Sequence, residues 1–163
     1  MVPIVFAHGL EGSPNGRKIE YLRTSGFEVV APDGRGLALV DRLVGLEAAT
    51  RGHGILLIGS SYGGLAAAHL AMLHPERFLG LLLLAPALHY SEPPVSDVTL
   101  LCPPPGVPTM VMHGLVDQVV PIESSRRYAE KGAALLEVDD DHSLAASLVA
   151  MVDAAYTLLK PQT

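Results

Sequence analysis

The sequence predicts an α/β protein, with a doubly wound, mainly parallel sheet of about six strands and helices on both faces. Short apolar runs alternate along the chain with longer stretches of helical periodicity. The runs have no polar side, which is typical of strands in a parallel sheet that helices cover on both faces. Crossovers between such strands are expected to be right-handed. The chain of 163 residues has the length of one domain, and we predict that residues 1–163 form it.

The strands are predicted from short apolar runs that end at turn-forming or polar residues. The runs cover residues 2–7, 27–31, 55–58, 80–85, 108–113 and 133–138. The first run ends at His8-Gly9 and the second at Pro32-Asp33-Gly34, both of which are turn sequences. The loops that follow these strands are therefore the places to search for functional residues.

The helices are predicted from apolar residues spaced three or four apart. They cover residues 17–25, 37–50, 63–74, 122–132 and 144–159. In the second helix, Leu39, Leu43 and Leu46 share one face, which we expect to pack on the sheet. The third stretch is small and apolar on most sides, which predicts a buried helix.

Residues 86–107 form the one long stretch without a regular pattern. Pro93-Pro94 and Pro103-Pro104-Pro105 exclude a continuous helix or a central strand at those points. Loops of this length are often lids or pocket walls. The segment could equally be a surface excursion with no role, and the sequence leaves both possibilities open.

Composition excludes several classes of protein. Hydrophobic residues make up 49% of the chain and charged residues 17%, which argues against disorder. The net charge of -6 argues against a nucleic-acid partner. The single cysteine, Cys102, excludes a disulfide framework and a multi-cysteine metal site. The longest apolar run is too short to span a membrane, and no basic segment precedes the first run. We therefore expect a cytoplasmic monomer or homodimer that acts on a small molecule away from membranes.

The sequence Gly59-Ser60-Ser61-Tyr62-Gly63 matches the G-x-S-x-G pattern, with Ser61 at its centre. It lies directly between a predicted strand and a predicted helix, which is the context of a nucleophile elbow. The flanking glycines let neighbouring backbone approach a serine held in a strained turn. The alternative is a glycine-rich turn in which the serine is incidental.

A serine nucleophile needs a base, and the base needs an acid that orients it. His142 is the candidate base, because it follows the last predicted strand and so lies at the same sheet edge as Ser61; the alternative is a surface histidine. Asp117 is the candidate acid, because it lies just beyond the fifth strand and completes the chain order Ser-Asp-His. Asp139, Asp140 and Asp141 compete for that role, but they crowd His142, and we interpret them as a solvated run. His113 is expected to pack or hydrogen-bond beneath the acid loop.

The chemistry also needs two backbone amides that bind the developing oxyanion. We predict that Leu10 and Tyr62 supply them, Leu10 from the turn after the first strand and Tyr62 as the residue after the nucleophile. Phosphate binding by this glycine-rich region is the rival interpretation, and the sequence lacks the lysine and the glycine spacing that it requires. Pocket-lining residues are expected at Glu11, Leu88 and Tyr90.

Together, His8-Gly9, the G-x-S-x-G sequence, HGLVDQVVP and Asp141-His142 resemble the α/β-hydrolase superfamily over essentially the whole chain. The sequences HGLEGSPNGRK and GSSYGG are similar to those of small, lidless YqiA-type esterases. The resemblance implies a minimal version of the fold, from which the first two strands and the cap are missing, with residues 86–107 in place of the cap. The serine departs from dienelactone hydrolases, which use cysteine, and from dehalogenases and epoxide hydrolases, which use aspartate.

The predicted function is hydrolysis of small carboxylic esters through an acyl-enzyme, with Ser61, His142 and Asp117 as the catalytic residues. A thioesterase or an amidase would use the same residues. A ligand-binding or signalling protein on a hydrolase scaffold is the alternative from another class. Neither a cofactor nor a metal is expected.

Overall fold

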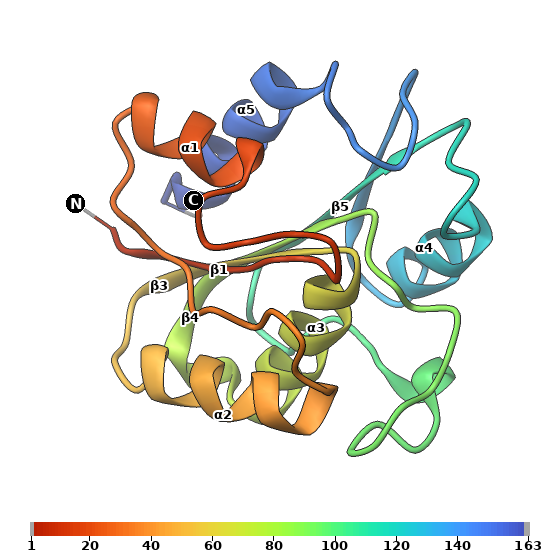
Figure 1. Cartoon of the computed structure of the whole chain (residues 1–163), viewed down its shortest axis with the longest axis horizontal. Coiled ribbons are helices and arrows are strands. Elements are labelled where there is room, and N and C mark those ends of the chain that lie inside the picture. The colour runs from red at the N-terminus through yellow and green to blue at the C-terminus, as the bar shows by residue number, and fades with distance from the viewer. Residues whose placement is uncertain (1, 162–163) are drawn as a thin grey trace.

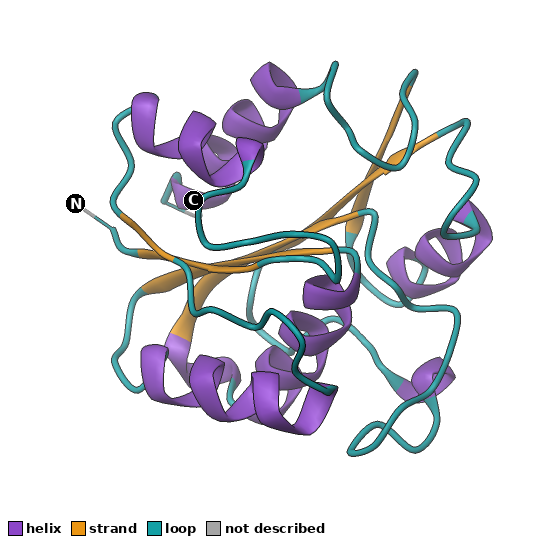
Figure 2. Ribbon diagram, viewed as in Figure 1, coloured by secondary structure: helices purple, strands orange, loops and turns teal. Residues whose placement is uncertain are grey.

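The computed structural model describes residues 2–161, whose strands form one six-stranded sheet with every strand pairing parallel (Figure 2). The strand order is β2-β1-β3-β4-β5-β6. The strands are β1 Ile4–Ala7, β2 Val29–Val30, β3 Ile55–Ser60, β4 Phe78–Leu84, β5 Thr109–Gly114 and β6 Ala134–Val138. The predicted open parallel sheet is confirmed.

Helices cover both faces of this sheet, as predicted (Figure 1). One face carries α1 (Arg17–Thr24) and α5 (Leu148–Leu159). The other face carries α2 (Leu39–Ala49), α3 (Tyr62–Leu73) and α4 (Ile122–Ala129). Two short 3-10 turns complete the elements, η1 (Pro75–Arg77) and η2 (Val98–Leu100).

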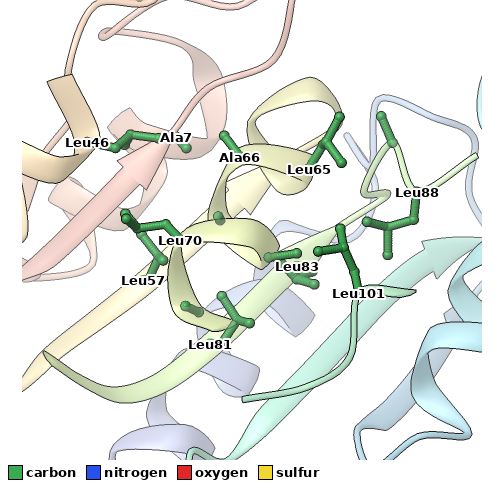
Figure 3. Packing of buried hydrophobic residues seen from close by; sticks show 14 of the residues in the cluster. Ala7, Leu46, Leu57, Leu65, Ala66, Leu70, Leu81, Leu83, Leu88 and Leu101 are labelled. Carbon is green, nitrogen blue, oxygen red and sulfur yellow. The ribbon is translucent and has the colours of Figure 1, made fainter. Parts of the chain in front are cut away.

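The core consists of two apolar clusters, one on each side of the sheet. Figure 3 shows the cluster around α3, in which Leu65 and Leu70 of the helix pack over Leu57, Leu81 and Leu83 of the strands. Both faces of β3 are buried, because each face meets a layer of helices. This burial explains why its sequence has no polar side.

The order of the strands determines which loops lie next to one another at the carboxyl edge of the sheet. The chain runs from β1 to β2 at one edge and then returns to β3 on the other side of β1. In open α/β sheets, ligands bind outside the carboxyl ends of the strands at such a reversal. The loops after β1 and β3 meet here, and the loops after β5 and β6 end at the same edge of the sheet.

Some boundaries differ from those predicted. The second strand comprises only Val29 and Val30. The last helix begins at Leu148 rather than Leu144, because Leu144 has a positive φ of 54° and ends a turn instead of starting a helix. Residues 86–107 contain η2 and a bridge between Glu92 and Val95, and are otherwise irregular.

Candidate active site

Ser61 occupies a strained turn between β3 and α3. Its backbone has φ 54° and ψ -116°, a left-handed conformation that a residue with a side chain rarely adopts. The Ser61 amide donates to the Leu84 carbonyl at 2.9 Å, and the Ser61 carbonyl accepts from the Ala87 amide at 2.8 Å. Bonds to the end of β4 and to the segment that follows it therefore hold the strained residue in place, as is typical of functional turns.

The glycines of the motif are explained by how closely this turn packs. A Cβ on Gly63 would overlap the carbonyl oxygen of Ala7 in β1. A Cβ on Gly59 would lie 2.6 Å from the Cβ of Ala67, which is closer than real side chains approach. The two glycines thus let α3 start directly against β1 and β3, which brings Ser61 beside the turn that follows β1.

His142, in the loop after β6, reaches this serine. Its Nε2 atom lies 3.0 Å from Ser61 Oγ, so the hydroxyl can donate to the ring. Its Nδ1 atom lies 2.8 Å from Asp117 Oδ2, so the opposite N–H can donate to the carboxylate. The structure thus brings together the three predicted residues in one hydrogen-bonded chain, in the arrangement that a serine, a base and an orienting acid require.

Asp117, in the loop after β5, has a fully buried side chain. Burial alone would raise the pKa of this carboxyl, but hydrogen bonds from the Val120 amide, His142 and the Val119 amide outweigh it and hold the pKa below its usual value. The Val119 and Val120 amides both donate to Oδ1 at 2.8 Å. The carboxylate is therefore charged and fixed in orientation, with Oδ2 facing His142.

The two amides predicted to bind an oxyanion have no hydrogen-bond acceptor within residues 2–161. The Tyr62 amide begins α3, where the first amides of a helix are unpaired. The Leu10 amide belongs to a turn that the Gly12 amide closes by donating to the Gly9 carbonyl at 3.1 Å. A Cβ on Gly9 would lie 3.4 Å from Ser61 Cβ, so this turn lies directly against the serine.

The residues predicted to line a pocket take different places. Glu11 is exposed, and Tyr90 is 38% exposed with its ring edge-on to that of Tyr62. Leu88 is 3% exposed and belongs to the core cluster around α3 (Figure 3), so it lies in the core rather than on the open surface. The exposed apolar side chains on the loops of the site include Leu10 and Val119.

The acidic run before His142 is more than a solvated stretch. Asp140 Oδ2 accepts from the Ala146 amide at 2.9 Å and from Ser147 Oγ at 2.7 Å, just ahead of α5. Asp141 accepts from the amide and the hydroxyl of Ser143. These carboxylates shape the loop that carries His142, a role that differs from the solvated run predicted for them.

Two further residues of the site were also missed. Glu92, in the irregular segment, accepts from the Tyr62 hydroxyl at 2.6 Å and from the Leu39 amide at 2.8 Å. Burial, and after it the hydrogen bond to Glu92, raise the pKa of Tyr62. Arg42 is 5% exposed on the inner side of α2. The signal for Arg42 was present in the sequence, because a cation stands on the apolar face defined by Leu39 and Leu46.

In the part of the chain that the structure describes, no group of three or more acidic, histidine or cysteine side chains could hold a metal ion. Among the helices of residues 2–161, none combines the length and the apolar character needed to cross a membrane.

The sequence matches no protein-family model and no curated protein. Its structure is similar to that of a protein of the alpha/beta hydrolase superfamily from Xanthomonas campestris pv. campestris, with 28% identity over 98% of both chains and a TM-score of 0.78. It is also similar to Est1E from Butyrivibrio proteoclasticus with ferulic acid bound, with 18% identity over 98% of this chain and 88% of that one and a TM-score of 0.79. The monoacylglycerol lipase of Paleococcus ferrophilus shares 19% identity over 96% and 94% of the two chains, with a TM-score of 0.76. The chain thus has the α/β-hydrolase fold, and the solved structures that it resembles are members of that superfamily.

Proposed function

We propose that the protein is a serine hydrolase that cleaves small carboxylic esters through an acyl-enzyme. The observation that carries the proposal is the unbroken chain of hydrogen bonds from Asp117 through His142 to Ser61. The strained backbone of Ser61 and the two unpaired amides beside it support the same chemistry. That neighbours of this fold include an esterase and a lipase agrees with it.

In the first half of the reaction, Ser61 Oγ forms a bond to the acyl carbon while its proton passes to His142 Nε2. The carbonyl π electrons move to the oxygen, and the Leu10 and Tyr62 amides bind the resulting oxyanion. Asp117 keeps the ring in the Nδ1–H tautomer and stabilises the imidazolium. The intermediate then collapses: the C–O bond to the alcohol breaks, and His142 returns its proton to the departing oxygen.

In the second half, water attacks the acyl-enzyme and gives its proton to His142. The same amides bind the second oxyanion, and the Ser61–acyl bond breaks as His142 protonates Oγ. The carboxylic acid leaves, and the enzyme returns to its starting state. The chain's own residues move every proton in this cycle.

The surroundings of Ser61 favour a small substrate. His142 is 24% exposed and Leu10 is 60% exposed, so the reacting groups lie near the molecular surface. The Glu92 contacts tie the irregular segment to Tyr62 and to the start of α2, which supports a role as a fixed wall of the site. The net charge of -6 agrees with a small-molecule substrate rather than a nucleic acid.

The test is a panel of p-nitrophenyl esters of graded acyl length, with matched thioesters and anilides. We expect turnover of short acyl esters, and a loss in Ser61→Ala on the order of 10⁴–10⁶-fold, by analogy with other triads. Ser60→Ala is the matched control, since Ser60 ends β3 and takes no part in the hydrogen bonds that join Asp117, His142 and Ser61. Equal activity of the wild-type and Ser61→Ala proteins would exclude the proposed function, and a preference for thioesters or anilides would change the substrate class.

A further inference from the structure

Arg42 is a buried cation that the proposed reaction does not use. It is 5% exposed, and within residues 2–161 no carboxylate lies within 4.0 Å of its guanidinium group. Burying a charge is costly unless other groups compensate it. The groups that surround Arg42 are therefore informative about its role.

The closest groups that compensate the charge of Arg42 are backbone carbonyls of the turn after β1, which carries the Leu10 amide. Its Nη1 donates to the His8 carbonyl at 2.6 Å, and its Nη2 donates to the Gly9 carbonyl at 3.3 Å. Its Nε contributes a longer bond of 3.4 Å to the Leu37 carbonyl. One planar guanidinium thus spans two consecutive carbonyls immediately before Leu10, a geometry that a lysine ammonium cannot reproduce.

Because the peptide unit is planar, the bond from Arg42 to the Gly9 carbonyl also fixes the direction of the Leu10 N–H. The Gly9 carbonyl and the Leu10 N–H belong to the same peptide unit, and in a trans peptide they point in opposite directions. Drawing the carbonyl toward Arg42 therefore turns the N–H away from Arg42. The ring of His8 supports the same orientation, since its Nδ1 lies 2.8 Å from the Gly9 carbonyl oxygen.

Arg42 also contacts the residue that carries the second amide. Its Cζ atom lies 4.6 Å from the centre of the Tyr62 ring, within range of a cation–π interaction. The Tyr62 hydroxyl donates to Glu92, so the ring is held at its far end as well. One side chain thus contacts both the turn that carries the Leu10 amide and the first residue of α3, Tyr62.

We propose that Arg42 is the positioning residue of the oxyanion hole, holding the Leu10 and Tyr62 amides in register with Ser61. The inference rests on the proposed function, because the amides matter only if an oxyanion forms. It goes beyond that function by assigning the geometry of the hole to a residue of α2. Arg42 itself contacts no reacting atom.

The variants Arg42→Lys and Arg42→Met separate this role from a merely structural one. A positioning role acts on the oxyanion and not on ground-state binding, so kcat should fall while KM stays nearly constant. We expect a loss of about 10-fold for Arg42→Lys and on the order of 10²-fold for Arg42→Met, comparable to the loss of one oxyanion donor. The matched control is Arg77→Lys, a largely buried arginine that is ion-paired with Glu47.

The direct readout is the affinity for an aryl trifluoromethyl ketone. Ser61 Oγ adds to the ketone carbon, its proton passes to His142, and the ketone oxygen becomes an oxyanion in the hole. The inhibition constant should rise by the same factor by which kcat/KM falls in each Arg42 variant. An unchanged inhibition constant in folded Arg42→Lys and Arg42→Met would overturn the proposal, as would a loss confined to KM.

Amide NMR tests the role of Arg42 without measuring turnover, so its result does not depend on whether the protein hydrolyses esters. In the ketone-free protein, Arg42→Lys should shift the Leu10 and Tyr62 amide resonances, whereas Arg77→Lys should not. In the wild-type adduct, the guanidinium protons of Arg42 should stay protected from exchange while both amides move downfield. Unshifted amides, or rapid exchange of those guanidinium protons, would reject the role of Arg42 even if ester hydrolysis is confirmed; a wild type no faster than Ser61→Ala would reject the proposed function instead.

Discussion

The Nε2 atom of His113 lies 3.1 Å from Asp117 Oδ2, the same oxygen that accepts from His142. The His113 ring is completely buried beneath the acid loop. Its Nε2 also lies 3.0 Å from the Val120 carbonyl, and its Nδ1 lies 2.7 Å from Ser125 Oγ. The neutral Nε2–H tautomer satisfies all three neighbours, with the Ser125 hydroxyl donating to Nδ1. His113 thus links the acid loop to α4.

Replacing this ring tests its support of the acid. His113→Phe should lower kcat by about 10-fold, because Asp117 keeps its two amide donors but loses the contact between its Oδ2 and His113 Nε2. It should also reduce the free energy of unfolding by about 1–3 kcal/mol, because Ser125 and the Val120 carbonyl lose a buried partner. Steady-state kinetics and urea unfolding measure the two effects. A variant with wild-type kcat would show that the backbone amides alone hold Asp117.

Buried histidines should make stability depend on pH between about 7 and 5. Burial lowers the pKa of His113, and burial likewise lowers the pKa of His8, each opposed by smaller favourable contacts. Below about pH 6.5 the unfolded chain takes up protons at these positions more readily than the folded protein, so stability falls as the pH is lowered. The slope reaches about 1.4 kcal/mol per pH unit for each such histidine.

Urea unfolding at several pH values measures this slope. His113→Phe should have a smaller slope than the wild type, because one of the two groups is gone. The lowered pKa of Asp117 acts in another window, since its contribution is lost only as the pH falls below about 3.9. Identical slopes for the variant and the wild type would mean that folding does not lower the pKa of His113.

Two helical glycines should respond in opposite ways to alanine. Gly63→Ala places a Cβ on the Ala7 carbonyl, and we expect a loss of about 3 kcal/mol or more from backbone overlap. Gly45→Ala, inside α2, meets nothing closer than the Pro32 Cβ at 3.6 Å. It should raise stability by about 0.5–1 kcal/mol through helix propensity and reduced chain entropy. Thermal unfolding compares the two, and equal effects would contradict the packing described for the elbow.

Asp117→Asn should favour the wrong tautomer of His142 at nearly unchanged shape, with a loss of up to about 10⁴-fold in kcat. Asp139→Asn is the matched control, because Asp139 makes no side-chain hydrogen bond within residues 2–161. Kinetics on a short acyl ester, with melting curves for folding, decide the matter. If Asp117→Asn kept nearly the wild-type kcat while Asp139→Asn was inactive, the orienting acid would be a residue of the loop that carries His142 and not Asp117.

The central strands could be predicted because burial on both faces leaves a run without charged residues, as in β1 and β3. The sequence predicted Ser61, Asp117 and His142 because each follows a strand that ends at the same edge. Their distances could not be predicted, since these depend on the strand order and on loop conformation. The start of α5 was misplaced because Leu144 continues the apolar pattern while its backbone forms a turn.

The sequence pattern did not predict the roles of side chains whose hydrogen-bond partners lie outside their own local pattern. Glu92 lies in a proline-rich stretch with no periodicity, and only the folded chain brings it to Tyr62 and the start of α2. Asp140 could not be distinguished from a solvated carboxylate until its bond to Ser147 was seen. The local sequence pattern therefore predicts which residues are catalytic candidates. It does not predict the contacts that orient them, because several of those contacts come from segments far apart in the chain.

The most direct test of the central claim is the site of labelling by a fluorophosphonate, read by peptide mass spectrometry. The serine oxygen displaces fluoride from phosphorus, so the adduct marks the residue that His142 activates. We predict one adduct, on Ser61, formed rapidly in the wild type and in Ser60→Ala and lost in Ser61→Ala and His142→Gln. Labelling at Ser60, or equally fast labelling in His142→Gln, would contradict the account.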